Sequence, residues 1–297
     1  MELERVVKPE QDQRLVGLLA VLGSQSSVNL GAAFAKSLFL VISPAGVTCL
    51  RVTFAALLLV ALRAPWKRVP PPSTRPALLL YGAMLAAMNL AIYQAFQRIP
   101  IGIAVGIEVT GPLAVVLLSS RRPRDFLWLL VVALGLALLL PLHVKDRLNP
   151  LGIAFALAAA SAWALYIVAG KRVAASLGAN AVTWGMIVAA LLVAPLGAAV
   201  LNFGQLRPWQ LGTALAVGLL SSAVPYSLEM EAMKRLSARV FSILLSAAPA
   251  IAAFAGFLVL GERLTWLQWG AMLCIMAASA GSALTAPVTP PPPTLET

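Results

Sequence analysis

The chain has 297 residues, of which 60% are hydrophobic and only 11% carry a charge. Soluble domains are about 45–50% apolar and about 25% charged. A mean hydropathy of +0.90 therefore excludes a soluble enzyme, a disordered scaffold and a nucleic-acid-binding module, because their surfaces must be solvated. The net charge of +11 does not indicate nucleic acid either, since the basic residues stand in small groups between apolar runs.

Ten apolar runs of about 18–22 residues follow one another, each long enough to cross roughly 30 Å of hydrocarbon as a helix. Short connectors that carry proline, glycine or charged residues separate them, and none is long enough for another domain. The predicted spans are residues 14–35, 44–63, 76–96, 101–120, 125–142, 150–170, 180–201, 209–230, 238–260 and 265–284. The sequence thus predicts an all-α integral membrane protein with ten transmembrane helices.

The basic residues fix the expected orientation of these spans. With a cytoplasmic N-terminus, the inside segments hold 15 Lys and Arg and the outside segments hold 6. Because cytoplasmic loops retain positive charge, both termini are expected inside. Residues 1–13 are then a cytoplasmic tail, unlike the basic start of a signal peptide, and the proline-rich residues 285–297 are a disordered cytoplasmic tail.

The chain also repeats itself weakly. The segment RIPIGIAVGIEVTGP at 98–112 aligns without gaps on RLSARVFSILLSAAP at 235–249. Each repeat holds five spans, an odd number, so the halves at 14–142 and 150–284 must insert with opposite orientation. Inverted repeats around a midplane site are typical of alternating-access carriers.

Several stretches carry a family resemblance. They are KSLF at 36–39, GVTCLR at 46–51, YGAMLAAMN at 81–89, the long segment 102–126, PYSLEM at 225–230 and LGERLT at 260–265. With these stretches the chain, from Arg14 to Leu284, resembles the drug/metabolite transporter superfamily, or EamA fold. The resemblance implies ten helices in two inverted five-helix halves. It also implies export of small amino acids of the threonine/homoserine type across a bacterial inner membrane, driven by the proton gradient.

One departure from the family limits what can be carried over. Relatives often place an acidic residue just before the proline of the ninth span, whereas here Ala247 and Ala248 precede Pro249. A coupling role for that acid has no counterpart in this chain.

Two charged residues inside spans are the first candidates for a site. Arg51 and Glu108 each lie seven residues into a span that runs inward, so both are expected about 10 Å below the outer surface. A zwitterionic amino acid needs an anion for its ammonium and a cation for its carboxylate. Glu108 stands in an apolar helix and lies in the specific segment, so it is also the candidate for proton coupling. The alternative is a permanent ion pair that braces two helices.

A second tier of polar residues at membrane depth predicts a wet cavity, although each one could simply hold helices together. Glu229 is a candidate gate or proton relay near the cytoplasmic mouth, and Glu262 is expected to fix a helix end. The remaining candidates for substrate binding are Gln25, Asn89, Tyr93, Thr110 and Tyr226.

Other interpretations stay open. Efflux of a drug or another amphipathic metabolite by the same fold is the first, and an intramembrane enzyme is disfavoured because only isolated carboxylates are present. The lone His143 and the distant cysteines offer no metal site, and no glycine-rich phosphate loop indicates ATP. We expect no cofactor; the expected partners are a small amino acid, protons and the bilayer, with a homodimer left open.

Overall fold

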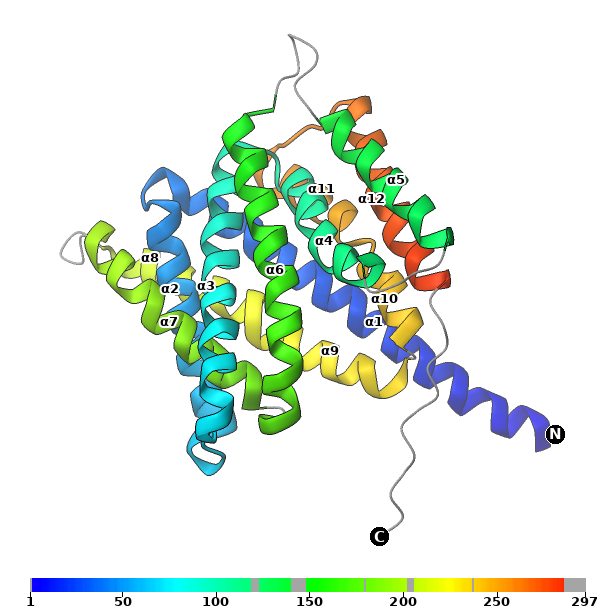
Figure 1. The fold of residues 1–297 in the computed structure, drawn as a ribbon, viewed down its shortest axis with the longest axis horizontal. Helices are drawn as coiled ribbons and strands as arrows, with labels where there is room; N and C mark the ends of the chain where they lie inside the picture. The colour runs from blue at the N-terminus through cyan, green and yellow to red at the C-terminus, as the bar shows by residue number, and fades with distance from the viewer. Residues whose placement is uncertain are drawn as a thin grey trace.

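The computed structural model describes residues 2–118, 123–139, 148–178, 180–201, 206–236 and 238–285. Within these ranges the chain is helical and contains no strand (Figure 1). The α-helices are α1 (Glu2–Ser37), α2 (Pro44–Arg63), α3 (Arg75–Arg98), α4 (Ile101–Leu118), α5 (Pro123–Leu139), α6 (Pro150–Leu177), α7 (Asn180–Val200), α8 (Pro208–Gly218), α9 (Val224–Arg235), α10 (Ala238–Leu245), α11 (Ala248–Leu260) and α12 (Trp266–Thr285). A π-helical turn, η5 (Leu219–Ala223), joins α8 to α9.

Seven segments of the described chain are long and apolar enough to cross a membrane. They lie in α1, α2, α3, α6, α7, the α10–α11 pair and α12, and α4 and α5 contain shorter apolar stretches. Large apolar side chains cover the outside of the molecule: Leu57, Leu191 and Phe254 are each at least 60% exposed. Such a surface suits lipid and would be a liability in water. The chain is therefore a multi-pass membrane protein.

The helices begin where the sequence supplies N-terminal caps. The Ser43 hydroxyl accepts a bond from the backbone N–H of Gly46, and Pro44 takes the first helical position of α2. The Asn149 side chain caps α6 in the same way, ahead of Pro150. These caps satisfy backbone donors that would otherwise be left unpaired at the helix ends.

Two predicted spans are interrupted rather than continuous. The span predicted at 209–230 contains the π-helical turn, and the span predicted at 238–260 breaks at Ser246 and Ala247. Each interruption comes just before a proline, Pro225 or Pro249, which cannot donate a hydrogen bond to the carbonyl four residues earlier. Membrane helices tolerate such breaks where neighbouring groups satisfy the freed backbone.

Of the two predicted terminal tails, the structure describes mainly the N-terminal one. Helix α1 begins at Glu2, so it continues back through the segment 1–13 predicted as a separate tail. Extending an existing helix needs no new nucleation, which explains why this polar segment joins it. The predicted C-terminal tail lies outside the described residues, apart from Thr285 at the end of α12.

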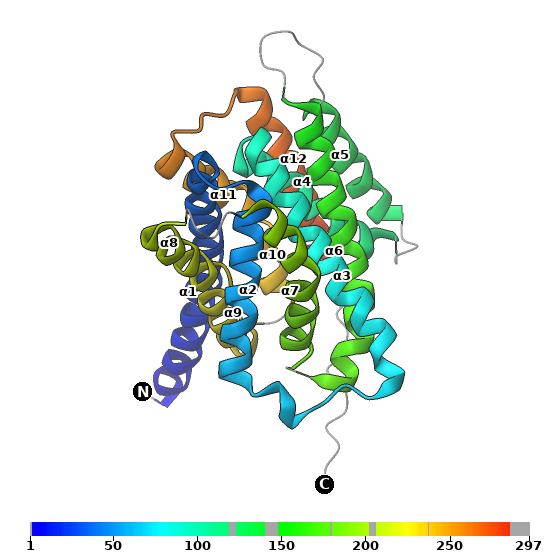
Figure 2. The same ribbon diagram turned by 90° about the vertical axis from the view of Figure 1, so that its left-hand side faces the viewer.

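Several pairs of helices pack closely against each other. Helix α3 runs beside α6 and α7, and α1 runs beside α9 and α11. Helices α2 and α7, α4 and α11, and α5 and α12 also pack against each other. Figure 1 shows the α5–α12 pair at one side of the molecule and α2, α7 and α8 at the other. In the turned view of Figure 2, α4 stands between the α5–α12 pair and the α2–α7 region.

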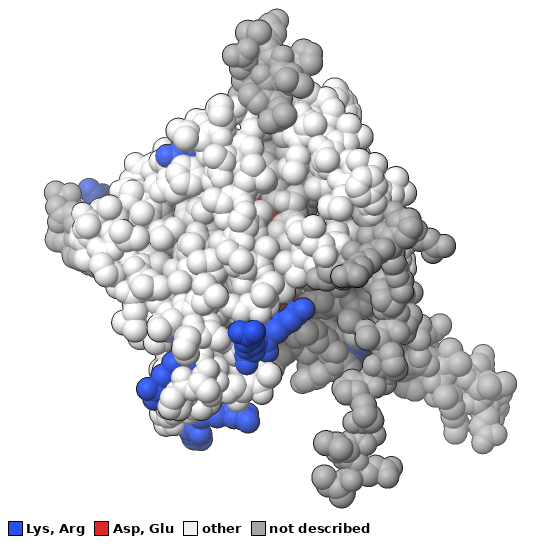
Figure 3. Space-filling model, in the orientation of Figure 1, with Lys and Arg blue, Asp and Glu red and all other residues white. Residues whose placement is uncertain are grey.

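Charge is distributed unevenly over the surface (Figure 3). Most of the Lys and Arg visible on this face gather at its lower end, with smaller groups at the upper left, and the middle is uncharged except for a few recessed acidic atoms. A hydrogen bond between Thr74 and Ser176 and another from Trp184 to the Arg68 carbonyl join the elements at that end. The exposed bases carried there are Lys67, Arg68, Arg75, Lys171 and Arg172.

Candidate functional site

Arg51 and Tyr93 meet between α2 and α3. The guanidinium carbon of Arg51 lies 5.2 Å from the centre of the Tyr93 ring, within the range of a cation–π interaction. The Phe39 and Phe96 rings hold the Tyr93 ring in place, with centroids at 5.9 Å and 5.5 Å. Helix packing therefore holds the cation by the face of a buried ring, and this contact uses none of its N–H donors.

Glu108 reaches the same region from α4. The positive charge of Arg51 acts on its carboxylate, as the equal depth of the two residues predicts. Within the described chain, however, no nitrogen of Arg51 lies within 4.0 Å of a Glu108 oxygen. Helices α2 and α4 also share no extended packing in this part of the molecule. The permanent ion pair bracing these two helices, left open by the sequence, is thus not what the structure contains.

Close packing of α4 against α6 fixes the position of Glu108. At Gly111, an added Cβ would lie 2.0 Å from the carbonyl oxygen of Ala160 on α6. One residue further, Pro112 lacks the N–H that would bond to the Glu108 carbonyl. The helix is therefore pressed against its neighbour directly beside the acidic residue, and a backbone acceptor is freed at the same point.

The other residues predicted to bind substrate differ in how many of their polar atoms are already bonded. The Thr110 hydroxyl donates to the carbonyl of Ile107 in its own helix, at 2.6 Å, so its proton is already used. The Asn89 amide nitrogen likewise donates one hydrogen bond to the Leu85 carbonyl, which leaves its second N–H and its amide oxygen for other partners. Gln25 is buried on α1, and in the described chain no hydrogen bond joins its side chain to Arg51 or Glu108.

A second polar group lies between α1 and α9. The Ser24 hydroxyl donates to the carboxylate of Glu229 at 2.9 Å, although 205 residues separate them in the sequence. The charge of Glu229 also acts on Tyr166, whose hydroxyl is bonded to that of Tyr81 at 3.0 Å. The side chain of Tyr226, the remaining predicted residue, lies outside the described part of the structure.

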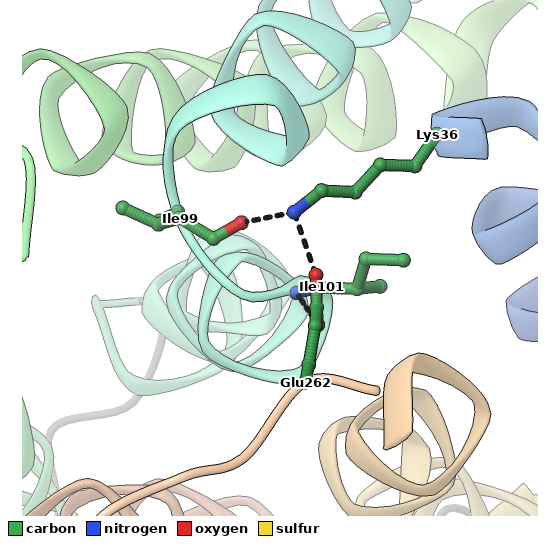
Figure 4. Close-up of polar contacts among 4 residues, drawn as sticks. All are labelled: Lys36, Ile99, Ile101 and Glu262. Carbon is green, nitrogen blue, oxygen red and sulfur yellow. Dashed lines mark hydrogen bonds and ion pairs between the residues drawn. The ribbon is translucent and has the colours of Figure 1, made fainter. Parts of the chain in front are cut away.

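An ion pair lies at the end of the molecule opposite the exposed Lys and Arg. It connects the end of α1, the start of α4 and the segment that follows α11 (Figure 4). The Lys36 ammonium lies 2.6 Å from one oxygen of Glu262 and donates to the Ile99 carbonyl at 2.9 Å. The other oxygen of Glu262 accepts the backbone N–H of Ile101 at the start of α4. Glu262 thus fixes a helix end, but this end is the start of α4, and its partner is Lys36 rather than the neighbouring Arg263 that the sequence suggested. We call these four residues the outer clasp, because the sequence predicts that this end faces outward.

Known proteins resemble this chain over most of its length. Residues 150–284 match the family model described as "EamA-like transporter family". The threonine/homoserine exporter RhtA of Salmonella typhimurium strain SL1344 is 45% identical over 270 residues, which cover 90% of this chain and 91% of that protein. RhtA of Escherichia coli strain K12 is 45% identical over 271 residues, with the same coverage. The chain belongs to the EamA-like transporter family.

A solved crystal structure agrees with this family assignment at the level of the fold. It superimposes with a TM-score of 0.60 at 20% sequence identity, covering 92% of this chain and 97% of the other. The relatives at 45% identity confirm the family resemblance predicted from the motifs. As a member of the EamA-like family, the chain is a transporter and not an enzyme.

Sequence reasoning missed some polar groups of this EamA-like chain. The hydroxyls of Ser221, Ser222 and Thr183 are buried and have no hydrogen-bond partner in the described structure. Two of them lie in the π-helical turn, a feature that often occurs at functional sites. A pair of serines placed just before Pro225 in an apolar span is the signal that could have identified them.

Proposed function

We propose that the chain exports small amino acids of the threonine/homoserine type. The observation that carries this proposal is a trio of polar groups that three helices bring to one region: the Arg51 guanidinium, the Glu108 carboxylate and the Tyr93 hydroxyl. No hydrogen bond to another described residue occupies any of the three. Their chemistry complements a carboxylate, an ammonium and a hydroxyl, which threonine and homoserine carry together.

The energetics of a membrane site favour this assignment. A charged side chain at the bilayer centre costs about 2.5–3.5 kcal/mol on insertion scales, and it is rarely left without a partner. A zwitterion bound between Arg51 and Glu108 offsets both costs at once. A neutral amphipathic drug would leave both charges uncompensated, so the drug-efflux alternative fits these residues less well.

Proton antiport is the proposed source of energy. The Glu108 carboxylate can bind either a substrate ammonium or a proton, but not both. Because the two ligands compete for this one group, the movement of one is coupled to the movement of the other. Glu229, bonded to Ser24 nearer the basic end, is proposed to pass the proton to the cytoplasm. No cofactor is needed for this cycle.

Energy-coupling measurements test the proposal. Cells loaded with labelled threonine or homoserine should stop exporting when an uncoupler collapses the proton gradient, even while ATP stays high. Export should continue when ATP is depleted and an artificial gradient is imposed. Transport that survives the uncoupler but stops on ATP depletion would contradict proton coupling. A panel of drugs exported in preference to amino acids would contradict the substrate class.

The proposed architecture is two inverted five-helix halves, residues 14–142 and 150–284, within ten spans. The packing supports it, because exchanging the halves maps the main contacts between them either onto one another or onto themselves. The α3–α6 contact corresponds to that of α8, η5 and α9 with α1, and α4–α6 corresponds to α11–α1. The pairs α2–α7, α4–α11 and α5–α12 map onto themselves. In the alternating-access cycle, the outer clasp would keep the outer end of the transporter closed, and it would break when the substrate is released.

We further propose that the basic end faces the cytoplasm of a bacterial inner membrane, with both termini inside. The gathering of exposed Lys and Arg at one end supports this orientation (Figure 3). A reporter fused after Thr297 should be cytoplasmic, and one inserted near Asp146 should be external. An external C-terminus would imply an odd number of spans and would rule out the inverted halves. All residues of the proposed site come from one chain, whether or not the protein forms a homodimer.

A further inference from the structure

The Tyr93 hydroxyl is the polar group of the site that the fold leaves without a partner. Tyr93 is 1% exposed, and its hydroxyl has no hydrogen-bond partner in the described structure. A buried polar group without a partner destabilises a fold, and buried hydroxyls are usually bonded. Tyr81, three turns earlier on α3, follows that rule because its hydroxyl bonds to Tyr166.

The packing of Tyr93 against its neighbours does not need the hydroxyl. The Tyr93 ring alone contacts Phe39 and Phe96, and the ring face alone carries the cation–π interaction with Arg51. Phenylalanine would make all three contacts without an unpaired polar atom. The hydroxyl is therefore suited to a group that is not part of the chain.

The position of the hydroxyl limits which group that is. It sits at the edge of the ring whose face lies under Arg51, the residue proposed to hold the substrate carboxylate. A ligand held at its carboxylate by Arg51 would bring its own side chain into the same region. We propose that the Tyr93 hydroxyl recognises the side-chain hydroxyl of the substrate and selects hydroxylated amino acids over aliphatic ones. This inference rests on the proposed export function and adds the residue that sets its specificity.

The test compares three amino acids with four carbons. Homoserine and threonine each become 2-aminobutyrate when the side-chain hydroxyl is replaced by hydrogen. In competition for export from loaded cells, the wild type should prefer both hydroxylated substrates. Tyr93→Phe should lower the ratio of homoserine or threonine export to 2-aminobutyrate export about 3- to 10-fold, the contribution of one neutral hydrogen bond.

Tyr81→Phe is the matched control, since it removes a hydroxyl from the same helix but one that is already paired. Its substrate ratios should equal those of the wild type. The two variants should also differ in thermal stability in detergent. Tyr93→Phe should be at least as stable as the wild type because it removes an unpaired group, whereas Tyr81→Phe should be less stable because it breaks a bond.

Two results would overturn the inference while leaving the export function intact: unchanged ratios for both substrates in Tyr93→Phe, or loss of folded Tyr93→Phe protein from the membrane. The second would mean that the hydroxyl serves the fold. A wild type that exports none of the three amino acids would overturn the proposed function and this inference together.

Discussion

Replacing Glu108 with glutamine should give a folded, membrane-inserted protein in which amino-acid export is largely abolished. Glutamine keeps the size of the side chain but neither titrates nor attracts an ammonium group. Truncating one partner of a buried charge pair costs about 2–5 kcal/mol. The affinity for substrate should therefore fall by more than about 30-fold. Any residual export should no longer respond to the pH gradient, because the exchangeable proton is gone.

Two companion variants sharpen the Glu108 experiment. Glu108→Asp keeps a carboxylate on a shorter side chain, so it should export more slowly but retain its pH dependence. The double variant Glu108→Gln/Arg51→Gln removes both charges and should be stable but inactive if both residues bind substrate. Glu108→Gln that exports homoserine at the wild-type rate with unchanged pH dependence would refute the assignment. A double variant that recovers export would instead show that neither charge binds substrate.

Adding one methyl group at Gly111 should destabilise the protein strongly. The Cβ of Gly111→Ala would lie 2.0 Å from the Ala160 carbonyl oxygen, a backbone atom that cannot move without shifting α6. Overpacking of this kind costs about 1–3 kcal/mol and occasionally more. We expect a lower melting temperature in detergent and less protein in the membrane. Export per folded molecule should fall as well, because the shift of α4 displaces Glu108.

Gly106→Ala on the same helix is the control for this effect. The nearest atoms to its added Cβ lie 3.7 Å away on Met272 and Pro249, which is ordinary van der Waals contact. Glycine-to-alanine changes in a helix without a clash are neutral or stabilising by about 0.4–1 kcal/mol. Equal stability of Gly111→Ala and Gly106→Ala would show that α4 does not pack on α6 as closely as described.

Packing brings together polar groups that are far apart in the sequence. Ser24 meets Glu229, and Lys36 meets Glu262, across more than two hundred residues. Both contacts join the first helix to the second half of the chain. A transporter that rocks one half against the other must change such contacts, so these two pairs are where movement should be measured first.

The sequence by itself determined the properties that depend on one segment at a time. Hydrophobic run length identified a membrane protein with several apolar helices. The rise of 1.5 Å per residue predicted Arg51 and Glu108 in the same region, and the charge of Arg51 does act on Glu108. These inferences succeed because helix formation and depth in the bilayer follow from local composition and spacing.

Only the tertiary structure decided which side chains face one another. It separated Arg51 from a direct ion pair with Glu108, placed the guanidinium over the Tyr93 ring, and showed the Thr110 hydroxyl bonded within its own helix. The rotation of each helix is set by contacts with neighbours distant in sequence, such as Gly111 on Ala160. Several small residues compete for such contacts, so periodicity alone does not select the pair that forms.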